Sequence, residues 1–344
     1  MEIAGGVERV ISIWSNYLVT KGYDVEIFTE DGEPSFYNLN KKINIKKLNY
    51  FSRIKIVPVF RVIKFFKFLR SLKKGNYVIF NKYIPTQSLY ILRKIGLFKD
   101  INLIYFAHGD VDDFISFYKK YQTKKIFKTY DKIICLKDEL KNKNNIIDRN
   151  KIVILPNPIS IILNTTANIN KKTVLTVGRL SYPKGYDMLI DVWEIVSKDA
   201  CDWKLNIIGS GELESELKKK VKEKNLDDSI YFLGQKKDIE KYYLNSSIFV
   251  SSSRYEGQPM VVLEALEAGL PIVSFDILAN RSLIDKNGIL VECYNIEKMA
   301  KAIKELIKND EKRLIMSKES KIKSKEFSIE NIYSKWNEIL KNEV

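Results

Sequence analysis

The sequence predicts a two-domain α/β protein in which each domain is a doubly wound parallel sheet. At 344 residues, 45% of them hydrophobic, the chain is longer than one compact core of the usual size requires. Short β-rich runs alternate with amphipathic stretches along both halves, which is the pattern of right-handed βαβ units. Between the halves, LPNPIS (155–160) carries two prolines and a polar stretch soon follows, so we place the domain boundary there.

The C-terminal half shows the alternation most clearly. We expect strands at 173–178, 203–209, 229–234, 248–253 and 271–276, and helices near 186–198, 213–225, 238–246 and 259–268. In such a sheet, ligands bind where the strands end at their carboxyl edge.

The N-terminal half alternates less regularly. We expect strands at 23–29, 76–81, 101–107, 132–136 and 151–156, and helices near 7–21, 58–74, 86–96 and 113–129. The segment 327–340 reads as a Ser-capped helix. The expected division is therefore one domain at 1–157, a second at 158–326, and a final helix within 327–344, with the cleft between the two domains as the default site.

The net charge of +15 is concentrated in one half of the chain. Residues 1–160 contain 29 Lys and Arg against 15 Asp and Glu, whereas residues 161–344 contain 29 against 28. A single basic half favours an anionic partner such as a nucleic acid, a membrane surface or a phosphorylated substrate, and a composition that serves only solubility is the alternative.

Composition also excludes several classes of protein. Cys135, Cys201 and Cys293 lie far apart without a Cys/His cluster, so we expect neither a zinc site nor a disulfide framework, but thiols in a reducing cytoplasm. No apolar run reaches the ~18–20 residues of a transmembrane helix. The first residues lack the apolar segment of a secretory signal, so we expect a cytoplasmic protein.

The stretch RYEGQPMVVLEAL (254–266) is the most informative motif. It follows a predicted strand and begins a helix near Pro259, whose first turn would offer free N–H groups to a phosphate. Glu256 lies in the loop, and Glu264 lies more than a turn inside the helix. The first can accept hydrogen bonds from a sugar and the second from a vicinal diol such as ribose; a capping acid and a solvated helix acid are the alternative.

Two neighbouring loops offer the same kind of chemistry. In GRLSYPKG (178–185), Arg179 and Lys184 follow a strand and can hold a diphosphate, Arg by its planar fork and Lys as a point charge. GSGELE (209–214) is a glycine turn that opens a helix. Three loops at one sheet edge therefore predict an anion-binding site.

These motifs, together with FLGQKKDI and EGQPMVVLEALEAGLPIVSFD, resemble the nucleotide-sugar-binding half of retaining glycosyltransferases of family 4, which have the GT-B fold. LPNPI resembles the interdomain linker of that family and AGGVERV its N-terminal glycine loop. The resemblance extends from Ala4 to about Leu340. It implies two Rossmann-like domains that face a cleft, and a final helix that crosses back to the N-terminal domain.

The resemblance also implies roles for individual residues. Arg179 and Lys184 would hold the donor diphosphate, Glu264 the ribose, and Glu256 the donor sugar on the face where retention is decided. The remaining donor-binding positions are a set of backbone and base contacts: Gly6, Gly209, Gly234, Gln235, Gly257, Gln258, Pro259, Met260 and Val261. Gly5, Gly6 and His108 would lie near the acceptor.

His108 is the only histidine of the chain and follows a predicted strand. A structural role is the alternative, but its position matches the cleft histidine of the family, so we include it with Glu256 among the catalytic candidates, without making it the sole general base. The pair Asp110 and Asp112 resembles a metal-binding Asp-x-Asp. Since Arg179, Lys184 and a helix N-terminus already supply positive charge, we expect no metal and no cofactor, and interpret the pair as loop acids or a helix cap.

RVIKFFKFLRSLKK (61–74) predicts a basic amphipathic helix, with aromatic and aliphatic residues on one side and Lys64, Lys67, Arg70 and Lys74 on the other. Such helices bind anionic membranes, and a core-facing helix with a solvated basic side is the equal alternative. Residues 114–132 have a similar character. Nucleic-acid binding would explain the charge but not Arg179, Lys184, Glu256 and Glu264.

The sequence thus predicts a metal-independent retaining transferase that moves a sugar from a nucleoside-diphosphate sugar, UDP-linked in our expectation, to a glycan or lipid-linked acceptor. Its place would be the cytoplasmic face of a bacterial membrane, in capsule, O-antigen or exopolysaccharide synthesis. An epimerase or hydrolase of the same fold, and a basic membrane-binding protein that has lost catalysis, are the alternatives.

The glycines at the start raise one further expectation. The family places a buried central strand before this loop, and only MEI and Ala4 precede Gly5 here. We therefore expect a first sheet without its central strand, and a truncated or misassigned start. The stretch ILANRSLI (277–284) also departs from the Gly-Pro turn of the family, which puts sugar contacts from this loop in doubt.

Overall fold

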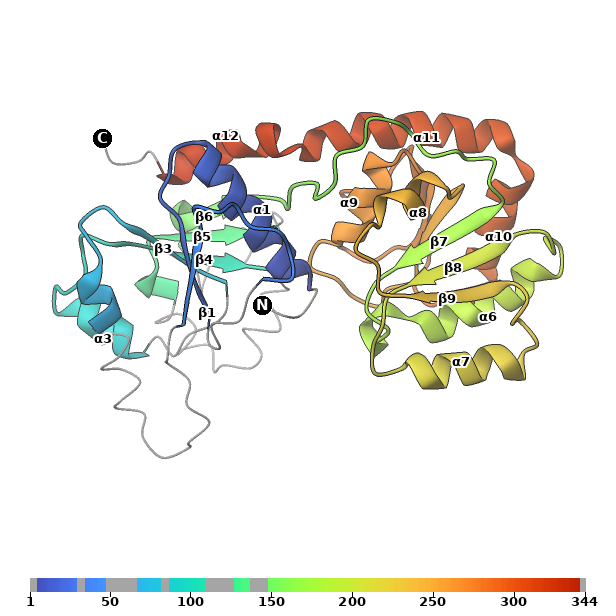
Figure 1. Cartoon of the computed structure of the whole chain (residues 1–344), viewed down its shortest axis with the longest axis horizontal. Helices are drawn as coiled ribbons and strands as arrows, with labels where there is room; N and C mark the ends of the chain where they lie inside the picture. The colour runs from blue at the N-terminus through green and yellow to red at the C-terminus, as the bar shows by residue number, and fades with distance from the viewer. Residues whose placement is uncertain are drawn as a thin grey trace. The chain divides into compact units, whose positions relative to one another are not determined.

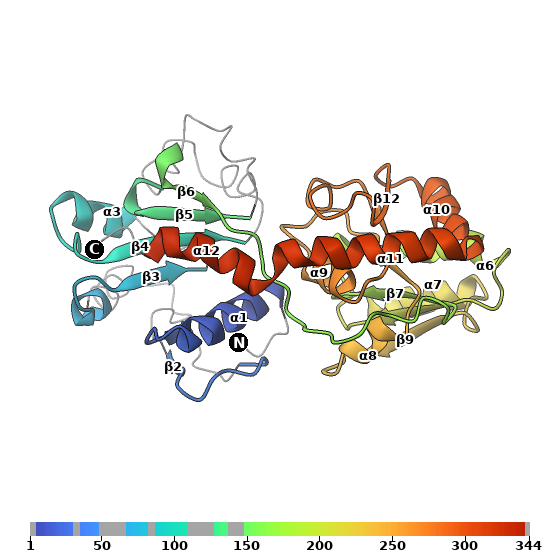
Figure 2. The ribbon, with the colours of Figure 1, turned by 90° about the horizontal axis from the view of Figure 1, so that it is seen from above.

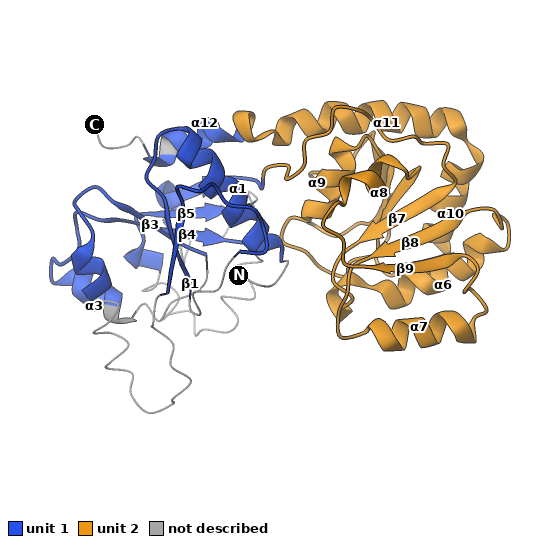
Figure 3. Ribbon diagram, in the orientation of Figure 1, with its two compact units in different colours: residues 1–157, 332–344 blue, residues 158–331 orange. Residues whose placement is uncertain are grey.

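The computed structural model describes residues 5–29, 35–47, 67–81, 87–108, 127–136 and 148–340. The chain divides into two compact units, one of residues 1–157 with 332–344 and one of residues 158–331 (Figure 3). Both are built on parallel strands, so the predicted α/β class with two Rossmann-like domains is confirmed. In the described part of the chain, no helix is both long and apolar enough to span a bilayer.

The second unit contains one six-stranded sheet in the order β12-β11-β10-β7-β8-β9, with every neighbouring pair parallel. Figure 1 shows α6 and α7 on one face and α8 and α9 on the other. The strands are β7 (Thr173–Val177), β8 (Lys204–Ile208), β9 (Ile230–Gly234), β10 (Ile248–Ser251), β11 (Ile272–Phe275) and β12 (Gly288–Val291). The helices are α6 (Tyr186–Ser197), α7 (Glu214–Glu223), α8 (Glu240–Leu244), α9 (Met260–Glu267), α10 (Ile296–Lys308) and α11 (Asp310–Ser324).

The strands of the second unit read as continuous apolar runs because helices cover both faces of a parallel sheet. All four residues of β10 and of β11 are buried. Trp193 of α6 is fully buried in the core against this sheet, and its indole Nε1 donates to Ser229 Oγ at 3.1 Å. The sheet is therefore a rigid support for the loops at its carboxyl edge.

The strand β12 and the helices α10 and α11 were not expected from the sequence. The signals were present: Asn295 and Asn309 cap the two helices, with side chains that accept from the backbone N–H groups of Lys298 and Lys312. The apolar run 289–291, which follows the pair Asn287-Gly288, indicates β12.

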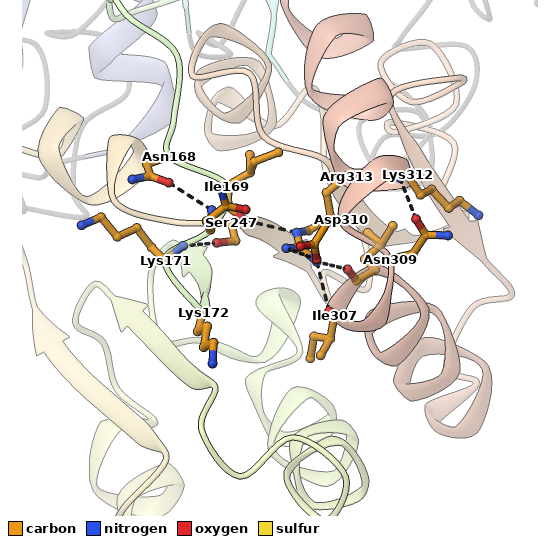
Figure 4. Close-up of polar contacts among 12 residues, drawn as sticks. Asn168, Ile169, Lys171, Lys172, Ser247, Ile307, Asn309, Asp310, Lys312 and Arg313 are labelled. Carbon is orange, nitrogen blue, oxygen red and sulfur yellow. Dashed lines mark hydrogen bonds and ion pairs between the residues drawn. The ribbon is translucent and has the colours of Figure 1, made fainter.

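Arg313 is buried at the junction of α10 and α11 (Figure 4). Its guanidinium donates to the carbonyl oxygens of Leu306 and Ile307 at 2.6 and 3.0 Å, and so satisfies the last turn of α10. It also reaches the Ile169 carbonyl at 3.2 Å and the Asp310 carboxylate at 2.8 Å. One buried cation thus joins two helices to the loop before β7.

The first unit has two parallel sheets among its described residues. The two-stranded one pairs β1 (Glu26–Thr29) with β2 (Asn44–Lys47), and the four-stranded one has the order β3-β4-β5-β6. These four strands are β3 (Tyr77–Phe80), β4 (Asn102–Ala107), β5 (Lys132–Cys135) and β6 (Ile152–Ile154), and the helices are α1 (Gly6–Thr20), α3 (Gln87–Lys94) and α12 (Ile329–Leu340). No described strand joins β1 to β3, and β2 was not predicted.

The C-terminal helix α12 lies beside α1 in the first unit (Figure 2). The rings of Trp14 and Trp336 meet edge to face with centroids 5.3 Å apart, and those of Tyr17 and Tyr333 do so at 5.1 Å. Both tryptophans are buried. Aromatic contacts therefore fix α12 to the N-terminal fold.

The described part of the basic segment 61–74 faces the core with its apolar side. Leu69 is fully buried in the core of the first unit, and the ring of Phe68 contacts that of Phe28 at 4.7 Å. Lys67 and Arg70 are exposed on the other side. For residues 67–74 the structure thus favours the core-facing helix, while residues 61–66 and most of 114–132 lie outside the described residues.

Candidate functional site

The loops that follow β7, β8 and β10 begin at adjacent positions of one sheet edge. These strands are neighbours in the order β10-β7-β8 and run parallel, so their carboxyl ends lie together. The three predicted motifs occupy these loops at 178–185, 209–213 and 252–259. The arrangement is that of a ligand site in an open parallel sheet.

Glycines bring the first two loops into backbone contact. A Cβ on Gly209 would lie 1.9 Å from the carbonyl oxygen of Gly178, and one on Gly211 would lie 2.3 Å from that of Leu180. Hydrogen bonds run from Gly178 N to Ile208 O at 2.9 Å and from Leu180 N to the Ser210 carbonyl at 3.0 Å. Only residues without a side chain allow this approach.

A third glycine brings the first loop against the loop after β10. Gly185 has a φ of +65°, and a Cβ there would lie 2.2 Å from the carbonyl oxygen of Ser252. Ser252 Oγ donates to the Lys184 carbonyl at 2.9 Å, and Arg254 N donates to the Pro183 carbonyl at 2.7 Å. The backbone that carries Lys184 is therefore held by the loop that carries Glu256.

Arg254, which was not among the predicted site residues, connects the same two loops. Its guanidinium makes a bidentate contact with the Asp187 carboxylate at 2.9 and 2.6 Å, donates to the Tyr182 carbonyl at 2.7 Å, and stacks over the Tyr182 ring at 4.1 Å. Burial alone would raise the pKa of Asp187, but the hydrogen bonds and charge of Arg254 lower it. The pair remains ionised at neutral pH.

Lys184 and Glu256 form a direct ion pair between Nζ and Oε1. Their side chains are only 22% and 14% exposed, so the pair is partly shielded from water. Ser253 Oγ donates to the same carboxylate oxygen at 2.8 Å. The structure thus brings together the residue predicted to hold the phosphate and the acid predicted to hold the sugar.

Arg179 lies in the same loop but pairs elsewhere. Its Nε is 3.2 Å from Oε2 of Glu212, and both side chains are more than half exposed. Glu212 belongs to the GSGELE turn and was not among the predicted site residues. An exposed pair of this kind contributes little stability, so Arg179 can leave Glu212 for a ligand at small cost.

Glu264 lies inside α9 and is fully buried. Its Oε1 accepts from Ser160 Oγ at 2.6 Å and its Oε2 from the Tyr243 hydroxyl at 2.8 Å. The alternative of a solvated helix acid is wrong, because the side chain has no exposed surface. Neither partner was identified from the sequence.

The other predicted donor-binding residues surround these side chains. Pro259 has an extended ψ of 110°, so α9 begins at Met260, one residue later than predicted. Gln258, Pro259 and Met260 are buried, whereas Gly257 and Val261 are half-buried. Gly234, with a φ of +68°, ends β9; its carbonyl accepts from Gly209 N at 3.0 Å, and Gln235 next to it is exposed.

In the first unit, His108 follows β4 and is largely buried. Its ring stacks on Phe106 with centroids 4.1 Å apart, and Nε2 lies 2.7 Å from Oδ1 of Asn81. Burial lowers the pKa of His108 from 6.5 to about 4, so the imidazole is neutral at pH 7. Because Oδ1 only accepts, Nε2 carries the hydrogen and Nδ1 is left as an acceptor.

The N-terminal glycines lie where the first helix begins. Gly6 is the first residue of α1, and Gly5 is its extended N-cap with a φ of −99°. The Gly5 carbonyl accepts from the hydroxyl of Tyr37 at 3.3 Å. Asp110 and Asp112 lie outside the described residues, and no group of three or more possible metal ligands occurs within the described ranges.

The protein has two doubly wound units, and one of them carries side chains suited to bind phosphate and sugar at the carboxyl edge of its sheet. These features define the class of GT-B glycosyltransferases. Two family models match consecutive parts of the chain: "Glycosyltransferase Family 4" residues 4–161, and "Glycosyl transferases group 1" residues 163–323. The chain belongs to glycosyltransferase family 4.

Relatives match over nearly the full length. An uncharacterized glycosyltransferase of Haemophilus influenzae is 33% identical, with 98% of this chain and 96% of the relative covered. The amylovoran biosynthesis glycosyltransferase AmsD of Erwinia amylovora is 30% identical with the same coverage. A Campylobacter jejuni relative, named as an α-1,4-N-acetyl-D-galactosaminyltransferase acting on a PP-undecaprenol-linked glycan, is 27% identical over 97% of this chain and 94% of its own.

Solved structures share the fold at low sequence identity. A glycosyltransferase from Rickettsia africae superposes with a TM-score of 0.78 at 20% identity, over 99% of this chain and 96% of that one. Anabaena HepE, in complex with UDP and glucose, superposes with a TM-score of 0.77 at 15% identity, over 100% and 98%. These similarities show that the chain shares the fold of these proteins.

Proposed function

We propose that the protein is a retaining glycosyltransferase that moves a sugar from a UDP-sugar to a glycan or lipid-linked acceptor during bacterial surface polysaccharide synthesis. The observation that carries the proposal is the half-buried pair of Lys184 and Glu256, which puts a cation for the leaving diphosphate next to an acid for the sugar. HepE in complex with UDP and glucose supports the donor, the amylovoran enzyme AmsD supports the pathway, and the Campylobacter jejuni relative supports the acceptor.

In this proposal the leaving diphosphate is stabilised by charge and by backbone donors. An ammonium group has three donors, so Lys184 can keep Glu256 and still reach a phosphate oxygen. Arg179, released from the exposed Glu212, adds a second cation. The free N–H groups at the start of α9, near Met260 and Val261, add partial positive charge. These groups supply the charge that a metal would otherwise provide, so we propose metal-independent transfer.

His108 contributes as a neutral group. With Nε2 bound to Asn81, its Nδ1 can accept a hydrogen bond from a sugar hydroxyl and orient it. Since its pKa is about 4, it remains an acceptor across the neutral range. Catalysis would then rest on electrostatic stabilisation of the diphosphate and on positioning.

The basic side of the first unit would attract the acceptor's membrane. Lys67 and Arg70 are exposed while the apolar side of their segment packs in the core. We therefore propose electrostatic association with the anionic inner face of the cytoplasmic membrane, without insertion of residues 67–74.

A panel of nucleotide sugars tests the proposal, with mass-spectrometric detection and with or without polyprenyl-diphosphate-linked acceptors. We expect transfer only with an acceptor, an α-linked product from an α-linked donor, and unchanged turnover in EDTA. Free sugar without acceptor would indicate a hydrolase, and an isomerised donor an epimerase. If no donor is bound or turned over, the proposed function is wrong.

A further inference from the structure

Both carboxylate oxygens of Glu264 accept a hydroxyl in this structure. Ser160 Oγ lies 2.6 Å from Oε1 and the Tyr243 hydroxyl lies 2.8 Å from Oε2. The Tyr243 hydroxyl is also 3.3 Å from the Val261 carbonyl, but the shorter contact is with the carboxylate. Hydrogen bonds to an ionised oxygen are the strong ones, so these contacts fix the orientation of the carboxylate.

The two hydroxyls differ in how easily they can leave. Tyr243 lies on α8 and is fully buried, so its ring cannot turn away without opening the core. Ser160 is half-exposed and lies at a bend, in a segment without helix or strand. The backbone around it is held independently, by Ile159 N to Phe327 O at 2.9 Å and by Leu163 N to Glu267 Oε1 at 3.3 Å. A rotation of the Ser160 side chain alone would therefore remove the serine hydroxyl from Oε1.

We propose that Ser160 occupies the place of a ribose hydroxyl on Glu264, and that Tyr243 holds the carboxylate for either occupant. The inference rests on the proposed function, because it requires a nucleoside diphosphate at this site. Exchange of one alcohol donor for another on the same carboxylate oxygen leaves the number of charge-assisted bonds unchanged. The serine thus gives Oε1 a hydroxyl donor in the free protein, where burial of a polar oxygen costs least when the oxygen is hydrogen-bonded.

Ser160 and Tyr243 are positioning residues in this scheme and have opposite effects on affinity. Removal of the Ser160 hydroxyl removes a competitor of the ribose, so Ser160→Ala should bind nucleotide more tightly. Removal of the Tyr243 hydroxyl releases the carboxylate, so Tyr243→Phe should bind it more weakly. Each change corresponds to about one net hydrogen bond, or roughly threefold to tenfold in Kd.

Calorimetry on the full chain with a ribose-deficient probe tests the inference. UDP, ADP and GDP are titrated first, and the 2′,3′-dideoxy analogue of the tightest binder is then compared with it. We expect Ser160→Ala to tighten the binding of the ribonucleotide and Tyr243→Phe to weaken it, with little change for the dideoxy analogue in either variant. Ser160→Thr, which keeps a hydroxyl, should match the wild type.

Matched controls lie elsewhere in the same unit. The hydroxyls of Ser197 and Tyr231 donate to nearby backbone carbonyls, so Ser197→Ala and Tyr231→Phe should leave both affinities unchanged. The inference is overturned if Ser160→Ala weakens ribonucleotide binding, or if either site variant changes the affinities for both probes equally. If none of the three nucleotides binds to the wild type, the proposed function itself fails. Should Tyr243→Phe not fold, the Ser160 variants alone decide.

Discussion

The two units use parallel strands in different ways. In the second unit six strands form one sheet, and the loops at its carboxyl edge are joined to each other by backbone contacts at Gly178, Gly185 and Gly209. In the first unit the described strands form a pair and a group of four. A Cβ added at Gly5 or Gly96 would meet a side chain, of Glu8 or Lys99, and one added at Gly22 or Gly75 would meet no atom within 4 Å. The candidate site of the second unit is therefore a set of loops that contact one another. In the first unit the candidate residue is a single side chain, His108, which is hydrogen-bonded to Asn81.

This difference explains why the motifs of the second unit are so specific. Where the backbone of one loop packs against that of another, few residue types fit at the contact. The motifs GRLSYPKG, GSGELE and EGQPM are therefore easy to recognise in the sequence. A side chain that only has to reach a ligand restricts one position. The sequence motifs of the first unit are therefore weak, even at His108, whose hydrogen-bond partner is well defined.

The largest effect should come from adding a methyl group where the second unit is tightest. In Gly209→Ala, the Cβ would meet the Gly178 carbonyl oxygen at 1.9 Å, and we expect a loss of about 4 kcal/mol or more in the free energy of unfolding. Gly75→Ala, in an open left-handed turn of the first unit, should cost only about 1–2 kcal/mol. Urea unfolding of both variants measures the difference, and equal costs would remove this contrast between the units.

Next in size should be the loss of transfer when the half-buried pair is broken. We expect Lys184→Ala and Glu256→Gln each to lower kcat roughly 10²–10³-fold, because each removes a group aimed at the developing charge. Lys218→Ala breaks an exposed pair with Glu214 on α7 and should leave turnover unchanged. Initial rates with the donor identified in the panel measure this. Full activity in either site variant would contradict the site.

The buried histidine should make the first unit sensitive to acid. The pKa of His108 is about 4 in the folded state and 6.5 ordinarily, so between these values the unfolded chain binds a proton that the folded chain does not. The free energy of unfolding therefore has its full value above pH 6.5 and falls by about 3 kcal/mol as the pH drops to 4. His108→Gln should lose correspondingly less stability over this range. Unfolding curves at several pH values measure the slope, and parallel slopes would contradict a neutral buried imidazole.

The smallest effect should be on membrane affinity. Lys67→Ala should weaken partition to vesicles containing phosphatidylglycerol about fivefold, as expected for one lysine near an anionic surface. Lys286→Ala, an exposed lysine of the less charged second unit, should change nothing. Vesicle sedimentation measures both. Equal effects would mean that the charge of the first unit has no special part in binding.

The sequence predicts the sheets and their loops well because strand ends are local features. Apolar runs that stop at Gly178 and Gly209 place both loops at the same edge once the strands are parallel. The partnership of Asn81 and His108 was within reach too, since each residue directly follows one of two adjacent strands.

Other parts of the site could not be predicted because they depend on packing between distant segments. Ser160 and Glu264 are 104 residues apart, and nothing in Glu-x7-Glu says that the second acid is buried. The same holds for Asp187 with Arg254, which are 67 residues apart. The partner of a charged side chain can be read from the sequence when both residues lie on one helix, as Glu214 and Lys218 do.

The packing of α12 in the first unit determines the order in which the two units can finish folding. The core of the first unit includes Trp336 against Trp14, and the hydroxyl of Tyr77 donates to the carbonyl of Leu340 at 2.6 Å. These contacts can form only after residues 336–340 have left the ribosome. The second unit, from 158 to 331, is continuous in the chain and can fold earlier. The half that is synthesised first is therefore the half that is completed last.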